Sequence, residues 1–388
     1  MAERNRWERL LLVVTSFLTG FIVRFAWPPL APVAVSDLGM DMSQAGSFIS
    51  AFYIGYVIIQ IPAGILGDRF GVRKLIVMAL GIQGLATIAM GFATGSLDGF
   101  LLRFLAGLGA GILFSSCIRC ISDWFEPRER GLAFGIMMIA PTGGGVLLPN
   151  LIMPSMAEIW GWRGAFIAVG IFALVLAVLL FLRLPGDEKK TGGSRDFFTG
   201  LKFVLSKRDL MLIALAGWGI MWGMISFIAW TNSYVKSLGY SLGEASLVMG
   251  LFGIGGIIAP LLAGWIIDRT GRPKAIMIVG CIVLIPLVGI FGMMTSLNML
   301  MLLGIVAGVF FGLINPPLTL LVPTYAGKEW AATAGGVAGC IFQIGSILGP
   351  SVIGLVYGFC NSYQWVFWIM SAGLLVTIGA LLMTGKAE

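Results

Sequence analysis

The stretch Gly64-Ile-Leu-Gly-Asp-Arg-Phe-Gly-Val-Arg-Lys74 returns two hundred residues later as Gly264-Trp-Ile-Ile-Asp-Arg-Thr-Gly-Arg-Pro-Lys274. The positions that match at the same offset are Gly64/Gly264, Asp68/Asp268, Arg69/Arg269, Gly71/Gly271 and Lys74/Lys274. Each copy lies between two long apolar runs, and a charged segment that contains glycine cannot lie in hydrocarbon. Both copies are therefore predicted to be short loops at a membrane face. The repeat itself predicts a chain made of two related halves.

The composition is that of a helical membrane protein. Of the 388 residues, 58% are apolar and only 11% are charged, and the mean hydropathy is +0.98. The apolar residues form long continuous runs, whereas an outer-membrane barrel has short alternating segments. The chain has no histidine, and its five cysteines lack a metal-binding spacing. We therefore predict no metal site, no cofactor and no catalytic constellation, and the chain is not expected to be an enzyme.

Twelve apolar runs are each long enough to cross a bilayer, which takes about 20 helical residues. They lie at residues 10–34, 44–66, 75–94, 99–121, 131–155, 163–184, 209–234, 245–266, 275–294, 297–322, 334–357 and 363–384. With a cytoplasmic N-terminus, all but five of the 25 Lys and Arg residues fall on cytoplasmic loops and tails. This asymmetry predicts that both termini are cytoplasmic. It also explains the net charge of +7 without a nucleic-acid partner.

One polar stretch, Pro185-Gly-Asp-Glu-Lys-Lys-Thr-Gly-Gly-Ser-Arg195, divides the spans into six plus six. We therefore predict an N-terminal six-helix bundle at residues 1–184, a cytoplasmic linker at 185–208 and a C-terminal six-helix bundle at 209–388.

The repeated pattern G-x-x-x-D-R-x-G-x-x-K, placed between the second and third spans of each half, resembles the signature loop of the major facilitator superfamily of transporters. The resemblance covers nearly all of the chain. It implies an all-α fold of twelve transmembrane helices in two pseudo-symmetric halves, in a plasma membrane or a bacterial inner membrane. We expect a monomer surrounded by membrane lipid.

Arg24 is the cation that lies deepest in the predicted spans. Counted from Arg9 at about 1.5 Å per residue, it is roughly 22 Å along the first span. A cation at that depth costs at least about 2.5 kcal/mol unless it meets water or a counter-charge, and every acidic residue can be placed in a loop, a tail or a span end. Arg24 is therefore predicted to face a central cavity and to bind an anion, most simply a carboxylate. The alternative is that Arg24 snorkels or hydrogen-bonds to backbone carbonyls; Pro28, which lacks an N–H, leaves the carbonyl of Arg24 available for other donors.

The segment Phe21-Ile-Val-Arg-Phe-Ala-Trp-Pro-Pro-Leu-Ala-Pro32 resembles the first span of the anion:cation symporter branch of that family. An arginine at this place in the branch is the expected ligand of the organic anion. Many members also carry a proton-coupling glutamate in the fourth span, where this chain has Ala110. The coupling partner is therefore left open between H+, Na+ and a counter-anion.

Other polar and aromatic residues at mid-depth are candidates for the remaining substrate contacts, although core packing, lipid contact or bonding between helices would explain them too. They are Tyr53, Trp218, Trp222, Asn315 and Gln343.

A second set of charged residues lies at the inner ends of the spans and is predicted to form conformational gates. It comprises Asp68, Arg69, Arg119, Asp123, Asp268 and Arg269. Arg103 lies near the outer end of the fourth span, where a structural and a functional role are equally open.

These features predict a secondary active transporter that moves a small organic anion, such as a carboxylate, by alternating access. A proton-coupled exporter of drugs or metabolites with the same fold is the alternative. It predicts an acidic residue in the middle of a span, and the sequence has none there.

Overall fold

The structure is a computed structural model that describes residues 2–138, 140–184 and 197–385. The description leaves out side chains at positions 2–6, 61, 64–70, 122, 123, 127, 128, 130, 131, 142, 143, 197–200, 328, 329 and 332. Every regular element in the described ranges is helical, as predicted. Contacts divide the chain into two compact units: Met1–Asp41 with Ala51–Gly192, and Met42–Ser50 with Gly193–Glu388.

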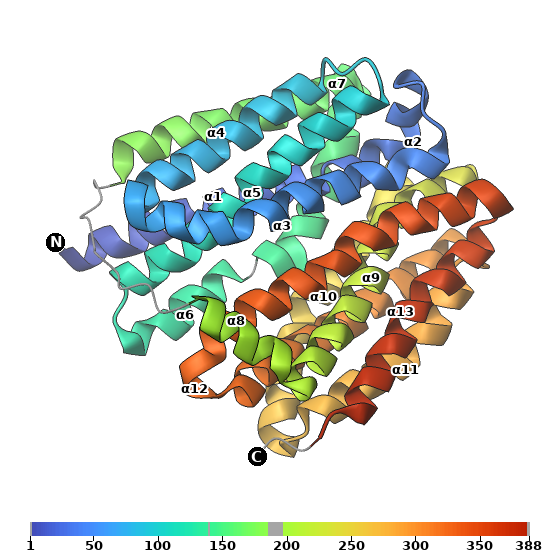
Figure 1. Ribbon diagram of the computed structural model, residues 1–388. Coiled ribbons are helices and arrows are strands. Elements are labelled where there is room, and N and C mark those ends of the chain that lie inside the picture. Colours follow the sequence, from blue (N-terminus) through green and yellow to red (C-terminus); the bar gives the residue numbers. More distant parts are fainter. Residues whose placement is uncertain (1, 139, 185–196, 386–388) are drawn as a thin grey trace. The chain divides into compact units, whose positions relative to one another are not determined.

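The first unit is built from the helices drawn in blue to green in Figure 1. Within it, α4 packs against α5 and α7, and α1 packs against the same two helices. The elements are α1 (Ala2–Phe25), α2 (Trp27–Asp37), α3 (Ala45–Phe70), α4 (Val72–Met90), α5 (Ser96–Trp124), α6 (Pro127–Met137), the π-helical turn η2 (Ala140–Gly144) and α7 (Gly145–Arg183). The part of α3 that belongs to this unit begins at Ala51.

In the second unit, α12 packs against α9, α10 and α11, and α13 packs against α9 and α11. Figure 1 shows these helices in yellow-green to red. The elements are the 3-10 turn η1 (Met42–Gln44), α8 (Phe197–Ser206), α9 (Arg208–Ser237), α10 (Leu242–Thr270), α11 (Pro273–Phe291), α12 (Leu297–Cys360) and α13 (Tyr363–Met383). The predicted linker, 185–208, thus includes α8, while residues 185–196 lie outside the described part of the chain.

Eleven helical segments of the described chain are long and apolar enough to cross a membrane. The predicted count of twelve spans is not reproduced. The residues of the span expected at 131–155 are divided among α6, η2 and the first part of α7, and α7 joins that part to the next span at Gly161, so that Gly145–Arg183 counts as one segment. A π-helical turn interrupts the regular hydrogen-bond pattern of a helix, and here it contains Pro141. α7 then continues to Arg183 through a bend at Gly161, whose φ is 70°.

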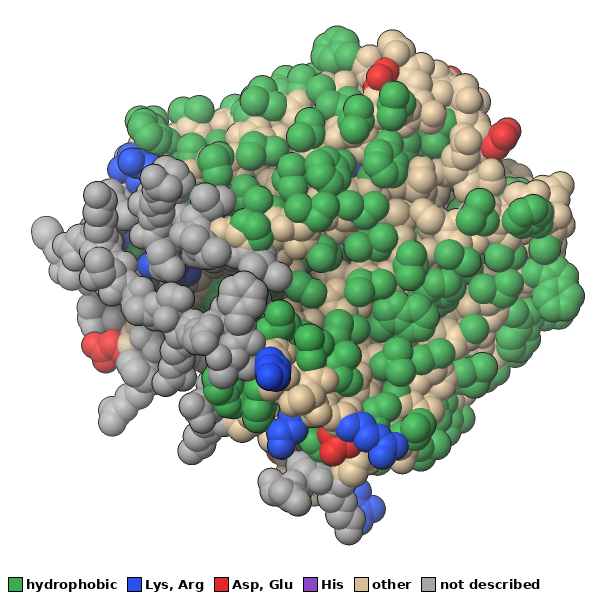
Figure 2. Space-filling model, in the orientation of Figure 1, with side chains coloured by type: hydrophobic (Ala, Val, Ile, Leu, Met, Phe, Trp, Pro, Cys, Tyr) green, Lys and Arg blue, Asp and Glu red, His purple; other side chains and the backbone are tan. Residues whose placement is uncertain are grey.

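The surface of the protein is suited to lipid. Figure 2 shows apolar side chains spread over the viewed face, with charged side chains at its margins. Leu261 and Phe359 are 78% and 89% exposed. Soluble proteins rarely expose apolar surface so extensively, which agrees with a protein whose solvent is hydrocarbon.

The two halves of the sequence repeat one backbone pattern. Among the described residues, positive φ angles pair at Gly39 and Gly239, at Gly71 and Gly271, and at Gly161 and Asn361, while Gly327 also has a positive φ but no such counterpart. Each pair is two hundred residues apart, which is the offset of the repeated segment. The loops predicted there are shorter than expected, because α3 runs to Phe70 and α10 to Thr270, so that only Gly71 and the pair Gly271 and Arg272 lie outside helices. Only glycine and, less readily, asparagine adopt this conformation without much strain.

The beginning of the second span belongs with the second unit, although it comes from the first half of the sequence. The Ser351 hydroxyl donates to Ser50 Oγ at 2.7 Å, and Ser50 donates to the carbonyl of Ile347. A Cβ atom on Gly46 would overlap the carbonyl of Pro350. The segment Met42–Ser50 therefore lies with its backbone directly against α12.

Candidate functional site

The first span is broken beside Arg24. α1 ends at Phe25 and α2 begins at Trp27, because Pro28 has no N–H to donate to the carbonyl of Arg24. The donor comes from α5 instead. Arg103 Nη2 donates to the Arg24 carbonyl at 2.5 Å, and Arg103 Nη1 donates to the Val23 carbonyl at 2.8 Å.

Arg103 thus has a definite place in the structure: its guanidinium caps the end of α1. Buried backbone carbonyls need hydrogen-bond donors, and those at the end of α1 are satisfied by a side chain 79 and 80 residues away. The carbonyl that Pro28 was expected to leave available is therefore occupied by Arg103.

The side chain of Arg24 lies in a cage of aromatic rings and is only 7% exposed. Among the described residues, its Cζ atom lies 4.4 Å from the ring centroid of Phe21, 4.7 Å from Tyr56, 5.3 Å from Tyr53 and 5.4 Å from Phe52. The faces of aromatic rings attract a cation, which offsets part of the cost of burial. They carry no net charge, so the positive charge of Arg24 is not neutralised.

Glycines bring the cage together. A Cβ atom on Gly107 would overlap the carbonyl of Phe52, and one on Gly111 would lie 2.6 Å from the carbonyl of Tyr56. α3 and α5 are therefore in backbone contact, which places Phe52 and Tyr56 beside the end of α1. Gly145 of α7 lies against the ring of Phe21 in the same way, with a Cβ distance of 2.8 Å.

No carboxylate of the described first unit balances Arg24. Its Nε atom is buried without a hydrogen-bond partner, and no described residue forms an ion pair with it. Glu129 is half-buried, and the other acidic side chains that are described in this unit are exposed. The exposed ones are Glu8, Asp37, Asp41, Asp98, Glu126 and Glu158.

The candidates from the second half lie in the second unit. The rings of Trp218 and Trp222 are 5.4 Å apart, and Trp222 Nε1 donates to the carbonyl of Ile369 at 3.2 Å. Asn315 Nδ2 donates to the Phe311 carbonyl at 2.9 Å, and Gln343 Oε1 accepts from Ser346 at 2.9 Å. These bonds are of the kind that joins or stiffens helices, so the substrate contacts of these residues stay a prediction.

Of the six predicted substrate-binding residues, the structure brings two together, Arg24 and Tyr53. It adds Phe21, Phe52 and Tyr56, which sequence reasoning missed. A signal was present, because Phe52-Tyr-Ile-Gly-Tyr56 spaces its aromatic residues as neighbours on one helix face. The spacing alone does not say which helix lies opposite that face.

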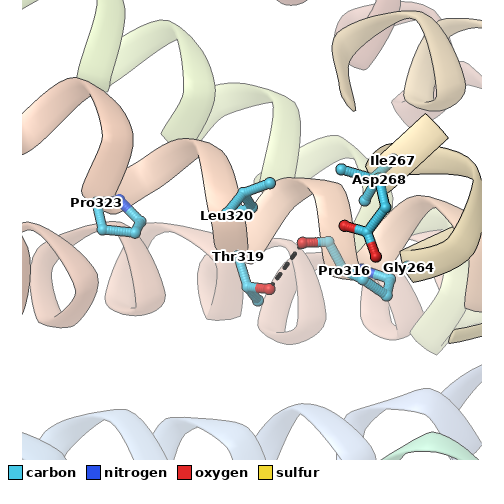
Figure 3. A pocket seen from close by; sticks show the side chains of 7 residues that line it. All are labelled: Gly264, Ile267, Asp268, Pro316, Thr319, Leu320 and Pro323. Atoms are coloured by element: carbon cyan, nitrogen blue, oxygen red, sulfur yellow. Dashed lines mark hydrogen bonds between the residues drawn. The ribbon is translucent and has the colours of Figure 1, made fainter. Parts of the chain in front are cut away.

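The predicted gates are described only in part. The side chains of Asp68, Arg69 and Asp123 lie outside the description, and Arg119 is half-buried on α5. Asp268 is exposed and lines a pocket of about 400 Å³ between α10 and α12. Figure 3 shows its carboxylate near Pro316, with Thr319 hydrogen-bonded to the Pro316 carbonyl at 2.9 Å. Arg269 lies over the ring of Trp265 at 4.0 Å.

The model of the Major Facilitator Superfamily matches residues 12–350 and 242–387. The chain belongs to this superfamily. Its members are transporters rather than enzymes, and the match covers both halves of the repeat.

Curated relatives extend the comparison over nearly the full chain. The probable sulfoacetate transporter SauU of Cupriavidus necator is 28% identical and covers 98% of this chain and 94% of its own. The hexuronate transporter of Bacillus subtilis is 24% identical, with coverage of 95% and 92%. The quinolone resistance transporter of Acinetobacter baumannii is 28% identical, with coverage of 87% and 82%.

A solved structure shows the same fold. The bacterial homologue of the human lysosomal transporter Spinster, in an inward-facing and occupied conformation, superimposes with a TM-score of 0.84. It is 16% identical and covers 99% of this chain and 97% of its own. Chemically, the site of the first unit is a buried and unneutralised guanidinium in a hydrophobic cage, which is an environment that favours an anion.

Proposed function

We propose that this protein is a secondary transporter that moves a small organic anion across the membrane by alternating access, with Arg24 as the ligand of the anion. The observation that carries the proposal is the burial of Arg24 among aromatic rings without any acidic partner in the described first unit. A carboxylate or sulfonate would supply the missing negative charge and accept hydrogen bonds from the planar guanidinium.

The relatives support an organic acid as cargo, since two of the three named above are transporters of sulfoacetate and hexuronate. Tyr53, Trp218, Trp222, Asn315 and Gln343 are proposed to contact the remainder of the anion. The repeated segments that contain Asp68 and Asp268, at the ends of α3 and α10, are proposed to act as gates. H+, Na+ and a counter-anion all stay open as the coupled species, and we place the protein in a cytoplasmic membrane with both termini inside.

The similarity to a quinolone resistance transporter favours one rival, an exporter of drugs or metabolites. Such an exporter, when driven by protons, needs an acidic group within the spans. The buried polar side chains of the described chain include arginines, amides and hydroxyls but no Asp or Glu. The rival therefore lacks a proton carrier in the part of the chain that is described.

Uptake into proteoliposomes tests the proposal. Purified protein is first screened by thermal shift against small carboxylates, sulfonates and phosphonates, because a ligand that binds the native state raises its apparent stability. Uptake of the best binder is then compared in wild type, Arg24→Lys and Arg24→Gln. We expect Arg24→Gln to lose uptake by about 100-fold or more and Arg24→Lys to retain a fraction, since lysine keeps the charge but not the planar fork.

Retained uptake and unchanged affinity in Arg24→Gln would remove Arg24 from the site. Stabilisation of wild type by quinolones, and by none of the anions, would favour the exporter instead.

A further inference from the structure

Two buried guanidinium groups share one aromatic ring in the first unit. Arg24 of α1 is 7% exposed and Arg103 of α5 is 2% exposed. Their Cζ atoms lie 5.4 Å and 4.9 Å from the ring centroid of the same residue, Phe52. The cage around Arg24 therefore lies within the field of a second cation.

Neither charge is neutralised by the described protein. The Nε atom of each arginine is buried without a hydrogen-bond partner, and no described acidic residue forms an ion pair with either one. The carbonyls of Val23 and Arg24 accept from Arg103, but a carbonyl dipole solvates a cation without removing its net charge. Two positive charges thus remain in the interior of the first unit.

We propose that the transported anion is a small dianion. One of its acidic groups binds Arg24, and Arg103 balances the second negative charge through its field. Arg103 is a positioning residue, since its Nη atoms are held by the carbonyls of α1 and it acts on the cargo through space. This inference rests on the proposed function and narrows its substrate class from organic anions to those with two charges.

A dianion is expected to bind more tightly than a monoanion because charges interact more strongly in the protein interior than in water. A monoanion on Arg24 leaves one uncompensated cation in the interior, whereas a dianion leaves none. At the effective dielectric constant of about 20 that suits such sites, one additional charge pair about 12 Å apart already changes an affinity by roughly tenfold. The same pair in bulk water would have little effect.

Matched pairs of anions test the proposal on the purified full-length protein. Malonate, succinate and glutarate are each compared with their monoamides, which have nearly the same size but one charge fewer. The readout is the dissociation constant from thermal-shift titrations at pH 7.5, where both acidic groups of each dianion are ionised. We expect at least one dianion to bind roughly tenfold more tightly than its monoamide.

Three variants distinguish the positive charge of Arg103 from its structural role in capping α1. Arg103→Lys keeps the positive charge, and Arg103→Gln keeps a donor for the carbonyls of α1 but removes the charge. Arg163→Gln is the matched control, because Arg163 also caps two carbonyls, those of Gly91 and Ala93, and also lies over a ring, that of Trp162. The preference for dianions should survive in Arg103→Lys and Arg163→Gln and fall to about twofold or less in Arg103→Gln.

Each outcome decides something different. Equal binding of dianions and monoamides by wild type would overturn the dianion inference and leave the proposed function in place. A preference that is unchanged in Arg103→Gln would overturn the role of Arg103. Failure of wild type to bind any member of the pairs, or any other anion of the wider screen, would overturn the proposed function as well.

Discussion

The two halves of the chain share a scaffold but differ in chemistry. Gly107 lies against the carbonyl of Phe52 in the first half, and Gly308 lies against the carbonyl of Phe252 in the second. Gly55 and Gly255 repeat this pattern against the carbonyls of Phe104 and Ile305. The close contact between these spans is therefore built twice, with glycines at matching positions.

Among the charged and aromatic residues of the site, only Phe52 has an equivalent in the second half, Phe252. Two hundred residues after Arg24 stands Met224, and after Tyr53 and Tyr56 stand Gly253 and Gly256. Pro28 is matched by Ile228, and α9 accordingly runs unbroken from Arg208 to Ser237. Counted back from Gly308, the position of Arg103 is taken by Gly304. The packing is therefore common to both halves, whereas the buried charges of the described residues, Arg24 and Arg103, both lie in the first half.

The largest expected effect comes from placing the charge in the half that has no cage. Met224→Arg should lower stability by at least about 2.5 kcal/mol, the cost of an arginine in a span without a partner. Thermal unfolding and yield of monodisperse protein measure it, with Met224→Leu as the control. If Met224→Arg were as stable as Met224→Leu, the cage around Arg24 would have no special role in accommodating a cation.

Substitution of the equivalent glycines Gly107 and Gly308 distinguishes an effect on helix packing from an effect on anion binding. Gly107→Ala and Gly308→Ala each introduce a methyl group against a backbone carbonyl, and each should destabilise the protein by about 1–3 kcal/mol. Only Gly107→Ala should also weaken anion binding, because it displaces Phe52, whose ring lies over both guanidinium groups. Thermal unfolding with and without the anion measures both effects. Equal losses of anion affinity in the two variants would contradict this assignment.

A smaller effect, on the Michaelis constant for uptake, is expected from Pro28, because the first span of the second half has no proline at the equivalent position. Pro28→Ala restores an N–H that can compete with Arg103 for the carbonyl of Arg24, so the Michaelis constant for uptake should rise by roughly threefold to tenfold. Pro32→Ala is the control, since Pro32 lies inside α2, beyond the break. An unchanged Michaelis constant in Pro28→Ala would show that the break does not position Arg24.

The sequence predicted the all-helical fold and the duplication, because both depend on local features: apolar runs of sufficient length and a loop with recognisable charges. Arg24 was predictable for a similar reason, as a cation deep in a span without a partner is costly in any fold. The count of spans was not reproduced, because η2 divides one predicted span and Gly161 joins its second part to the following span, and hydropathy reveals neither feature.

The cage itself was beyond sequence reasoning. Tyr56 and Phe52 reach Arg24 only because glycines of α5 bring α3 close to the end of α1. Arg103 donates to carbonyls of α1 that are 79 and 80 residues away in the sequence. Such contacts depend on the rotation of each helix about its axis, which apolar spans of nearly uniform composition do not specify. The substrate contacts of the second half and the gates stay predictions for the same reason.

The central claim is that Arg24 is a buried charge whose partner is the cargo. The most direct test is the apparent melting temperature of Arg24→Met, which gives the first half the residue of the second, measured with and without the best-binding anion. We predict that the ligand-free variant melts at the same temperature as wild type or higher, because an unpaired buried charge is removed, and that the anion no longer shifts it. A ligand-free variant that melts lower than wild type and still responds fully to the anion would contradict the account.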